Sequence, residues 1–176
     1  MGPGRQGNSG WSTPRSRKLF ATSSSGRMGR DFLMTPDEVN GFVAIQYPAV
    51  SEGGFSCEET GEGVALARWR HQPEELRPGG LISGVTQFTL CDLALWFATF
   101  TVIGLEAMAL TADMSIRFLR PAKGGDLLGR ATLVHSGRNR LIGEIALWVD
   151  GAPERLVGHA TGSYAPPRKE ETPNQT

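Results

Sequence analysis

The sequence predicts an α+β domain in which a curved antiparallel β-sheet wraps around one long central helix. Residues 88–103 form an almost wholly apolar segment of helical length, with Asp92 as the one charge. Residues 108–165 form four segments with a strand-like, two-residue pattern, separated mostly by hairpin turns. Such strands pair antiparallel and need an apolar element to cover one face. Only the central helix is apolar enough to do so.

The first predicted element is a short helix from Thr35 to about Gln46. Thr35 suits the capping position, Pro36 suits the first turn, and two acidic residues follow that complement the helix dipole. A short strand is expected around residues 55–57, and the alternating residues 64–70 predict a half-exposed strand. An irregular loop rich in Pro and Gly then leads to the central helix.

After Gly104 the sequence changes to a two-residue period. The segment from Met108 to Phe118 predicts a long strand with one apolar face, and Thr111 falls on the opposite, polar face. A hairpin turn is expected at residues 137–139. The three further predicted strands cover residues 126–136, 140–149 and 155–165.

Composition indicates one ordinary globular domain, since the 176 residues are 39% hydrophobic and 20% charged. We expect this domain to span residues 34–167, followed by a polar tail at 168–176. Residues 1–33 are rich in Gly, Ser and Arg. A disordered tail, an organelle transit peptide and a mis-assigned start codon are all compatible with this composition, so these alternatives stay open.

Charge and cysteine content limit the partners of the protein. The first 30 residues hold six basic residues and no acidic one, which leaves 12 basic against 18 acidic residues in the rest. An acidic body argues against nucleic acid as the main partner. Two cysteines are too few for a disulfide scaffold, so a cytoplasmic location is expected. Asp92 interrupts the longest apolar run, so no membrane span is predicted.

The start of the central helix is the first candidate site. Ser83 suits the N-cap position, and the backbone N–H groups of Gly84 and Val85 have no partner inside the helix. Free amides at the positive end of a helix dipole bind anions or oxyanions, and Gly84 lets a substrate carbonyl come close. An ordinary capped helix has the same features, so the pattern alone does not establish a site.

Asp92 is the second candidate. It lies about two and a half turns into the helix, where a buried carboxylate costs several kcal/mol unless it is paired or hydrogen-bonded. Thr89 and Thr99 share its helical face and offer it hydrogen bonds in a purely structural role. A catalytic carboxylate in an apolar cleft is the alternative. Both interpretations stay open at this point.

The remaining polar residues give weaker signals. Arg120, Lys123 and Arg138 lie at strand ends and turns, where solvated surface is the simplest interpretation. Together they could hold the phosphates of a nucleotide-bearing substrate. No spacing characteristic of a metal site joins the histidines, which are His71, His135 and His159. The sequence therefore predicts no metal.

Three segments resemble hotdog-fold acyl-CoA thioesterases of the phenylacetate-degradation, or PaaI-like, branch. Residues 83–92 resemble the family's His-Gly-Gly segment with an acid further along the helix. Residues 116–126 are similar to its NFLRPARGGD strand end, and residues 157–164 to its closing A-x-A-T-G-T-Y strand. The resemblance covers residues 35–167. Ser83 stands where the family has His, and Val85 stands where it has a second Gly.

The resemblance implies a homodimer or homotetramer with active sites shared between subunits. The Gly84 amide would polarise the thioester carbonyl, and Asp92 of the partner subunit would activate water or attack directly. The family often places a helper hydroxyl near the position of Thr111. The implied catalytic set is therefore Asp92, Gly84, Ser83 and Thr111, and the implied contacts for coenzyme A phosphates are Arg120, Lys123 and Arg138.

We therefore expect an enzyme that hydrolyses the thioester of a small or medium acyl-CoA, without a cofactor, because coenzyme A is part of the substrate. The substitution of the family His by Ser83 leaves a non-catalytic acyl-CoA-binding hotdog module as the alternative. A hotdog hydratase or dehydratase is a weaker third possibility, because the helix has no suitable His nearby. A membrane-surface role is not expected, since the central helix has too little polar face.

Overall fold

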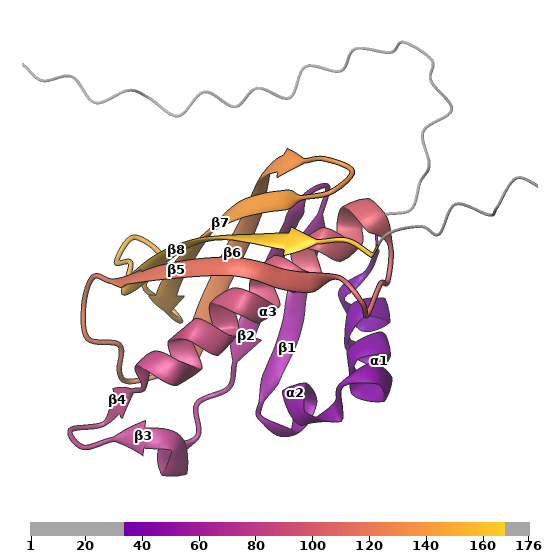
Figure 1. Cartoon of the computed structure of the whole chain (residues 1–176). Helices are drawn as coiled ribbons and strands as arrows, with labels where there is room; N and C mark the ends of the chain where they lie inside the picture. The colour runs from indigo at the N-terminus through magenta and orange to yellow at the C-terminus, as the bar shows by residue number, and fades with distance from the viewer. Residues whose placement is uncertain (1–33, 168–176) are drawn as a thin grey trace, which may run out of the picture. The chain divides into compact units, whose positions relative to one another are not determined.

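A computed structural model describes residues 34–167. The expectations for residues 1–33 and 168–176 lie outside these described residues. The domain has three helices, a 3₁₀ turn and eight strands (Figure 1). The helices are α1 (Pro36–Gln46), α2 (Pro48–Glu52) and α3 (Gly84–Ile103). The strands are β1 (Phe55–Gly61), β2 (Val64–Trp69), β3 (Leu76–Arg77), β4 (Leu81–Ile82), β5 (Leu110–Phe118), β6 (Leu127–Ser136), β7 (Leu141–Val149) and β8 (Gly158–Ala165).

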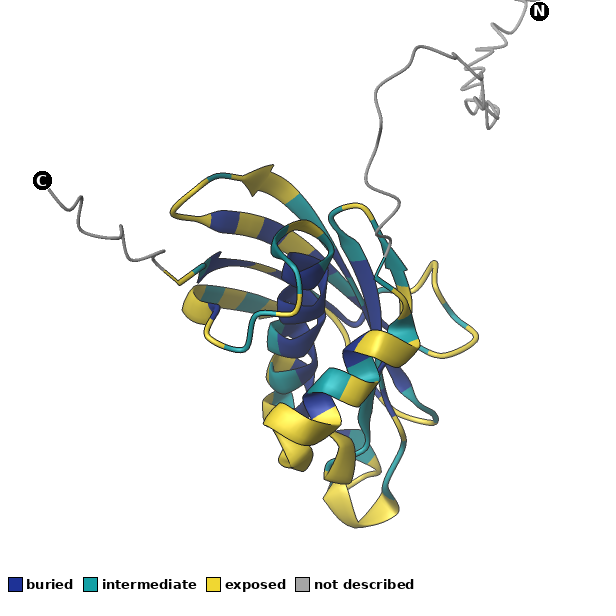
Figure 2. Cartoon of the chain, turned by 90° about the vertical axis from the view of Figure 1, so that its right-hand side faces the viewer, coloured by how far each residue is buried: buried dark blue, intermediate teal, exposed yellow. Residues whose placement is uncertain are grey.

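The central helix, α3, begins and ends where the sequence predicts. Ser83 is the N-cap, and its side-chain oxygen accepts a hydrogen bond from the backbone N–H of Thr86. Gly104 is the C-cap, with a φ of 87° that favours glycine. Most of the helix is buried, as Figure 2 shows, and it stands in the concavity of the sheet. The predicted fold class, an antiparallel sheet curved around one long helix, is confirmed.

Six strands form the main sheet in the order β1-β2-β6-β7-β8-β5, and every neighbouring pair is antiparallel. The hairpins β6–β7 and β7–β8 agree with the predicted turns. The strand β5, however, pairs with β8 and not with its chain neighbour β6. As a result β5 is an edge strand, and most of its residues are exposed. The outer side of this nine-residue strand presents backbone N–H and C=O groups that can pair with another strand.

The core lies between α3 and the concave face of the sheet. On the helix side Leu90, Leu95 and Phe97 are completely buried. Burial of each such side chain contributes about 1.5–3 kcal/mol. Gly143 of β7 lets the strand come close to α3, since a Cβ there would lie 2.6 Å from Leu95 Cδ1. The helix therefore has little freedom to shift.

Two short helices, α1 and α2, pack against each other and against β1 at the side of this core. Thr35 caps α1, as the sequence predicts, and it also forms a capping box with Glu38, which was not predicted. Asn40 of α1 bonds both the N–H and the C=O of Cys57 in β1, at 2.8 and 2.9 Å. The sequence does not predict α2. Nor does it predict the small β3–β4 hairpin, which replaces the expected irregular loop before α3.

A β-bulge in β5 changes the faces of that strand. The pairing register with β8 shifts between Thr111 and Asp113, so Ala112 is the extra residue. Thr111 therefore faces the helix, together with Met114 and Ile116, although the sequence places it on the opposite, polar face. The predicted single apolar face from Met108 to Phe118 is wrong for this reason.

By length and composition α3 could cross a membrane, which the sequence did not suggest. It has 20 residues and one charge, but most of its residues are buried inside the domain. The sheet already covers the apolar side chains that a lipid phase would otherwise solvate. This helix is therefore the core helix of the domain.

Candidate active site

The first turn of α3 offers free backbone donors. Ser83 Oγ accepts from Thr86 N at 3.0 Å and pairs with Thr86 Oγ1 at 2.8 Å. The N–H groups of Gly84 and Val85 have no recorded acceptor within residues 34–167. The first turn of α3 also contains no acidic residue that could compete for them. An anionic or carbonyl oxygen can therefore bind here.

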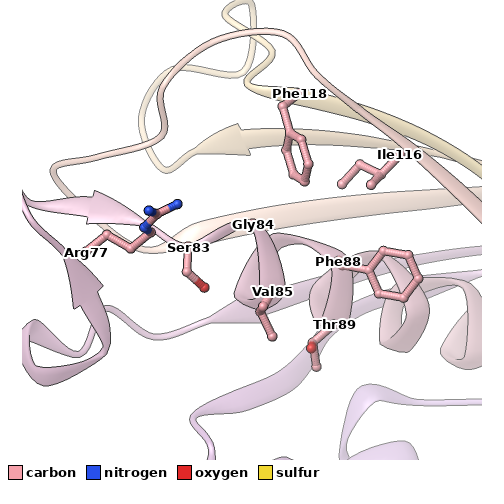
Figure 3. Close-up of a pocket in the computed structure, with 8 residues that line it drawn as sticks. All are labelled: Arg77, Ser83, Gly84, Val85, Phe88, Thr89, Ile116 and Phe118. Atoms are coloured by element: carbon pink, nitrogen blue, oxygen red, sulfur yellow. The ribbon is translucent and has the colours of Figure 1, made fainter.

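A groove opens at these amides. It has a volume of about 640 Å³. Figure 3 shows Phe118 and Ile116 of β5 facing the start of α3, while Arg77 of the β3–β4 hairpin lies beside Ser83. The lining residues are Arg77, Ser83, Gly84, Val85, Phe88, Thr89, Ile116 and Phe118. The groove thus combines apolar walls, free amides and a single charged group.

Arg77 gives the groove a positive charge. No carboxylate among residues 34–167 lies within ion-pair distance of its guanidinium. The partial positive charge at the start of α3 lies at the same groove. The groove therefore favours a ligand that carries negative charge, or one that develops it during a reaction. Arg77 was not among the predicted site residues, because β3 and β4 were not predicted.

Asp92 lies further along α3, half-buried beside the edge of the sheet. Its Oδ1 accepts a hydrogen bond from Thr111 Oγ1 at 2.8 Å and another from the Tyr164 hydroxyl at 2.7 Å. The structure thus brings together Asp92 and Thr111, two of the predicted catalytic residues. Tyr164 completes the cluster and was not among the predicted site residues.

The expected structural partners of Asp92 are wrong. Thr99 is completely buried and donates to the backbone oxygen of Trp96 at 2.6 Å. Thr89 lines the groove, and no hydrogen bond to Asp92 is recorded for it. Both hydroxyls that hold the carboxylate come from the sheet, so the helical periodicity of α3 could not reveal them.

Within one chain, the amides and the carboxylate do not meet. Gly84 and Asp92 are eight residues apart on a continuous helix, which corresponds to about 12 Å along its axis. Asp92 does not line the groove that contains Gly84. One chain therefore provides two separate half-sites, one with the amide donors and one with the acid.

The three predicted phosphate-binding residues are also divided. Arg120 and Lys123 lie in the loop between β5 and β6, and Arg120 Nη1 donates to the backbone oxygen of Leu156 at 2.7 Å. Arg138 lies in the turn after β6, at the other end of that ten-residue strand, about 30 Å away. A single phosphate cannot contact all three in one chain. In the part of the chain that the structure describes, no group of His, Cys, Asp and Glu could hold a metal ion.

Solved structures of other proteins have the same architecture as this chain. A protein of Silicibacter sp. TM1040, described as a candidate thioesterase, has a crystal structure that matches with a TM-score of 0.70. It is 32% identical, and the match covers 76% of this chain and 92% of that one. The Escherichia coli PaaI protein, from the phenylacetic acid degradation operon, matches in fold with a TM-score of 0.63. It is 20% identical over 73% of this chain and 91% of PaaI.

Sequence comparison agrees with the structural match. A protein of Saccharolobus solfataricus named as a candidate esterase is 22% identical over 161 residues, which is 92% of this chain and 97% of that protein. A six-stranded antiparallel sheet curved around one long helix is the architecture of the hotdog class of proteins. Within that class, the sequence profile of the thioesterase superfamily matches residues 79–154, and this chain belongs to that superfamily. The predicted family is confirmed, and thioester hydrolysis is the reaction class that it indicates.

Proposed function

We propose that the protein hydrolyses the thioester bond of a small or medium acyl-CoA. The observation that carries this proposal is the pairing of free amides at Gly84 and Val85 with an apolar groove of about 640 Å³. The groove can receive an acyl group on its apolar walls while the amides bind the thioester oxygen. Membership in the thioesterase superfamily supports the choice of the thioester as the reacting bond.

The Gly84 amide acts as the oxyanion donor. When a nucleophile attacks the thioester carbon, the carbonyl oxygen gains negative charge, and a preorganised backbone N–H at a helix start stabilises that charge. Removal of one such donor typically lowers the rate by about 10²–10³-fold. Ser83 supports this donor as the cap of the helix, because its hydroxyl is already bonded to Thr86.

Asp92 acts as the base or the nucleophile. As a base, its carboxylate takes a proton from water while the water oxygen bonds to the thioester carbon; the C–S bond then breaks, and the thiol leaves with a proton. As a nucleophile, it first attacks the thioester carbon, so that the C–S bond breaks, coenzyme A leaves as a thiolate that takes a proton from water, and an anhydride remains. Water then hydrolyses that anhydride, which releases the carboxylic acid and restores Asp92. The products, a carboxylic acid and free coenzyme A, are the same in both routes.

Two copies of the chain complete each site. The half-sites of one chain are about 12 Å apart along α3, so the acid that serves one groove must come from another chain. The exposed edge of β5 and the exposed apolar side chains near the helix start, Val85 and Phe88, offer surfaces for that contact. We therefore propose a homodimer or homotetramer. We also propose a cytoplasmic location, for which the support is that Cys57 and Cys91 are buried and form no disulfide.

Release of free thiol across a panel of acyl-CoAs tests the proposal. Wild type should hydrolyse at least one short or medium acyl-CoA, and Asp92→Asn should lose most of that activity. Asp113→Asn is the matched control, because Asp113 lies on the same edge strand but bonds Ser163 and not the cluster around Asp92. Equal rates in wild type and Asp92→Asn would overturn the assignment of Asp92.

A mixing experiment tests the shared site. Gly84→Pro removes the amide donor at the first helical position, where proline is tolerated, and Asp92→Asn removes the acid. Each variant alone should be nearly inactive. When the two are unfolded together and refolded, mixed dimers contain one intact site, so activity should return. No recovery in mixtures that form mixed dimers would contradict the shared site.

One observation favours a second candidate function, a non-catalytic acyl-CoA-binding module. Ser83 occupies the position of the family His, and its hydroxyl is engaged in capping α3, so it is not directed at a substrate. An acyl-CoA that raises the melting temperature of the protein without thiol release would support this function. Turnover by wild type that Asp92→Asn abolishes would exclude it.

A further inference from the structure

The two hydrogen bonds that hold Asp92 end on the same carboxylate oxygen. Thr111 Oγ1 lies 2.8 Å from Oδ1, and the Tyr164 hydroxyl lies 2.7 Å from the same atom. Thr111 belongs to the edge strand β5 and Tyr164 to its neighbour β8, and the two residues face each other across the strand pair. The β-bulge after Thr111 brings both side chains onto the helix-facing side of the sheet.

Tyr164 is fixed as a donor to this carboxylate. Only 4% of the residue is exposed, and its hydroxyl also lies 3.1 Å from the backbone oxygen of Asp92. Burial raises the pKa of the Tyr164 phenol well above its usual range, and the negative charge of Asp92 raises it further. The phenol therefore stays protonated at neutral pH, and its hydroxyl donates a hydrogen bond to Asp92.

The second carboxylate oxygen of Asp92, Oδ2, does not share these hydrogen bonds. Within residues 34–167, no side chain or backbone group is recorded as a donor to Oδ2. Asp92 is also half-buried and not sealed in the core, so this oxygen can reach a molecule that docks on the same edge. The carboxylate is therefore asymmetric, with one oxygen bound twice and the other free.

We propose that Tyr164 is a positioning residue for thioester hydrolysis: together with Thr111 it fixes Oδ1 of Asp92, so that Oδ2 is the oxygen that acts on water or on the thioester. This inference rests on the proposed function, in which Asp92 is the base or the nucleophile. It adds a residue and an atomic assignment to that function. Without the two donors, the carboxylate could rotate and present either oxygen in many orientations.

Because both donors bond the same atom, Asp92 Oδ1, their effects on kcat should depend on each other. If one donor is removed, the other still holds Oδ1, so each single variant keeps part of the orientation. If both are removed, nothing fixes the carboxylate. A hydrogen bond to a charged group is strong enough for each single loss to lower kcat by about tenfold, and the double loss should exceed the product of the two single losses. KM should change little, because neither hydroxyl lines the groove.

The experiment uses five variants of the full chain with the best acyl-CoA substrate. Tyr164→Phe and Thr111→Val each remove one donor and nearly preserve side-chain volume, and a third variant combines them. Ser163→Ala is the matched control. Ser163 is a buried neighbour on β8 whose hydroxyl donates to Asp113, so its loss removes a similar bond away from the cluster. Thr111→Ser, which restores a hydroxyl, should recover most of the activity lost in Thr111→Val.

The outcomes separate the inference from the proposed function. We expect reduced kcat and unchanged KM in both single variants, a more than multiplicative loss in the double variant, and normal activity in Ser163→Ala. If Asp92→Asn is inactive while Tyr164→Phe has wild-type kcat, the positioning role is wrong and the proposed function stands. If Asp92→Asn is fully active, Asp92 is not the base or the nucleophile, and the positioning role of Tyr164 is wrong with it; absence of thiol release by wild type would overturn the proposed function itself. Should Tyr164→Phe not fold, Thr111→Val and its Ser rescue decide whether Oδ1 is held, and no loss in Thr111→Val overturns the inference.

Discussion

The ring of Phe118 lies directly against Gly84. A Cβ added at Gly84 would come within 3.2 Å of Phe118 Cζ, which is closer than ordinary van der Waals contact allows. Phe118 is 54% exposed, so its ring lines the groove and is not packed in the core. A side chain at position 84 would therefore push the Phe118 ring away from the amide by a few tenths of an ångström.

The first prediction separates the amide of Gly84 from its lack of a side chain. Gly84→Ala keeps the N–H and adds the crowded Cβ, whereas Gly84→Pro adds bulk and removes the N–H. We expect a moderate loss of kcat in Gly84→Ala and a further loss of about 10²-fold in Gly84→Pro, because only the latter lacks the oxyanion donor. Steady-state thiol release measures both. Equal activity in the two variants would contradict the role of the amide.

The effect of crowding can be isolated in the same series. Phe118→Leu removes the ring atoms that the new Cβ would meet. In the Gly84→Ala background this change should therefore recover part of the lost activity. In the Gly84→Pro background it should recover almost none, since the missing donor cannot be restored by space.

Arg77 should contribute to the binding of an anionic substrate. It is the charged residue of the groove and has no acidic partner among the described residues. We expect Arg77→Met to raise KM several-fold and to weaken the dependence of KM on salt concentration, because an unpaired charge near the ligand is lost. Initial rates at several ionic strengths provide the measurement.

The matched control for Arg77 is Arg117→Met. Arg117 lies on β5 between Ile116 and Phe118, and successive side chains of a strand point to opposite faces, so Arg117 faces away from the groove. The two variants change net charge equally. If both raise KM to the same extent, the effect belongs to the net charge of the protein and not to the groove.

Lys123 should contact the phosphate end of coenzyme A. It is exposed in the β5–β6 loop, which follows directly from Phe118 at the groove. We expect Lys123→Ala to raise KM for an acyl-CoA and to leave KM for the matching acyl-pantetheine unchanged, since the latter has no nucleotide phosphates. A parallel increase for both substrates would show that Lys123 does not act on the phosphates.

The two cysteines should resist alkylation in the folded protein. Burial, with a smaller contribution from the charge of Glu58, raises the pKa of Cys57 to about 12. Burial and the charge of Asp92 raise the pKa of Cys91 to about 12 as well. Because the thiolate is the reactive form, iodoacetamide at pH 8 should modify neither residue until urea unfolds the chain. Mass spectrometry of the protein before and after the addition of urea would measure how many cysteines are alkylated.

The same cysteine shifts predict the sign of a pH effect on stability. The folded state keeps both thiol protons to a higher pH than the unfolded state does. The free energy of unfolding should therefore fall as the pH rises from the ordinary thiol pKa of about 9 toward 12. Urea denaturation over this range would show the fall, and a Cys57→Ser, Cys91→Ser variant should show less of it.

Asn40 should stabilise the attachment of α1 to β1. Its side chain bonds both backbone groups of Cys57, so Asn40→Ala leaves two partly buried polar groups without a partner. We expect the free energy of unfolding to fall by about 1–3 kcal/mol, with kcat unchanged. Asn139→Ala, in the exposed turn after β6, is the control and should have almost no effect.

The central helix and most strands could be predicted because their signals are local. Ser83 and Gly104 mark the ends of α3, and the apolar run between them fixes its burial. The pairing of β5 with β8 is different, because it joins segments separated by two other strands. The two-residue hydrophobic period and the turn residues show that a strand exists, but they do not show which distant strand it pairs with.

The part of the candidate site that lies on α3 could be predicted from local signals, and the part that the sheet contributes could not. Gly84 and Asp92 lie on one helix and share a sequence signal, whereas Tyr164 is 72 residues from Asp92 and reaches it only through the sheet. Thr111 was placed on the wrong face, because the pattern of β5 contains no sign of the bulge after it. Only the resemblance to the family pointed to Thr111, and only the structure shows how it reaches Asp92.

The spacing of Gly84 and Asp92 along α3 also has a consequence for how the activity responds to concentration. On the proposed mechanism, a single chain holds both chemical groups and yet contains no complete site. Catalysis is then a property of the associated state, and mass action governs it. Specific activity should fall when the protein is diluted below its dissociation constant, even though every chain remains folded.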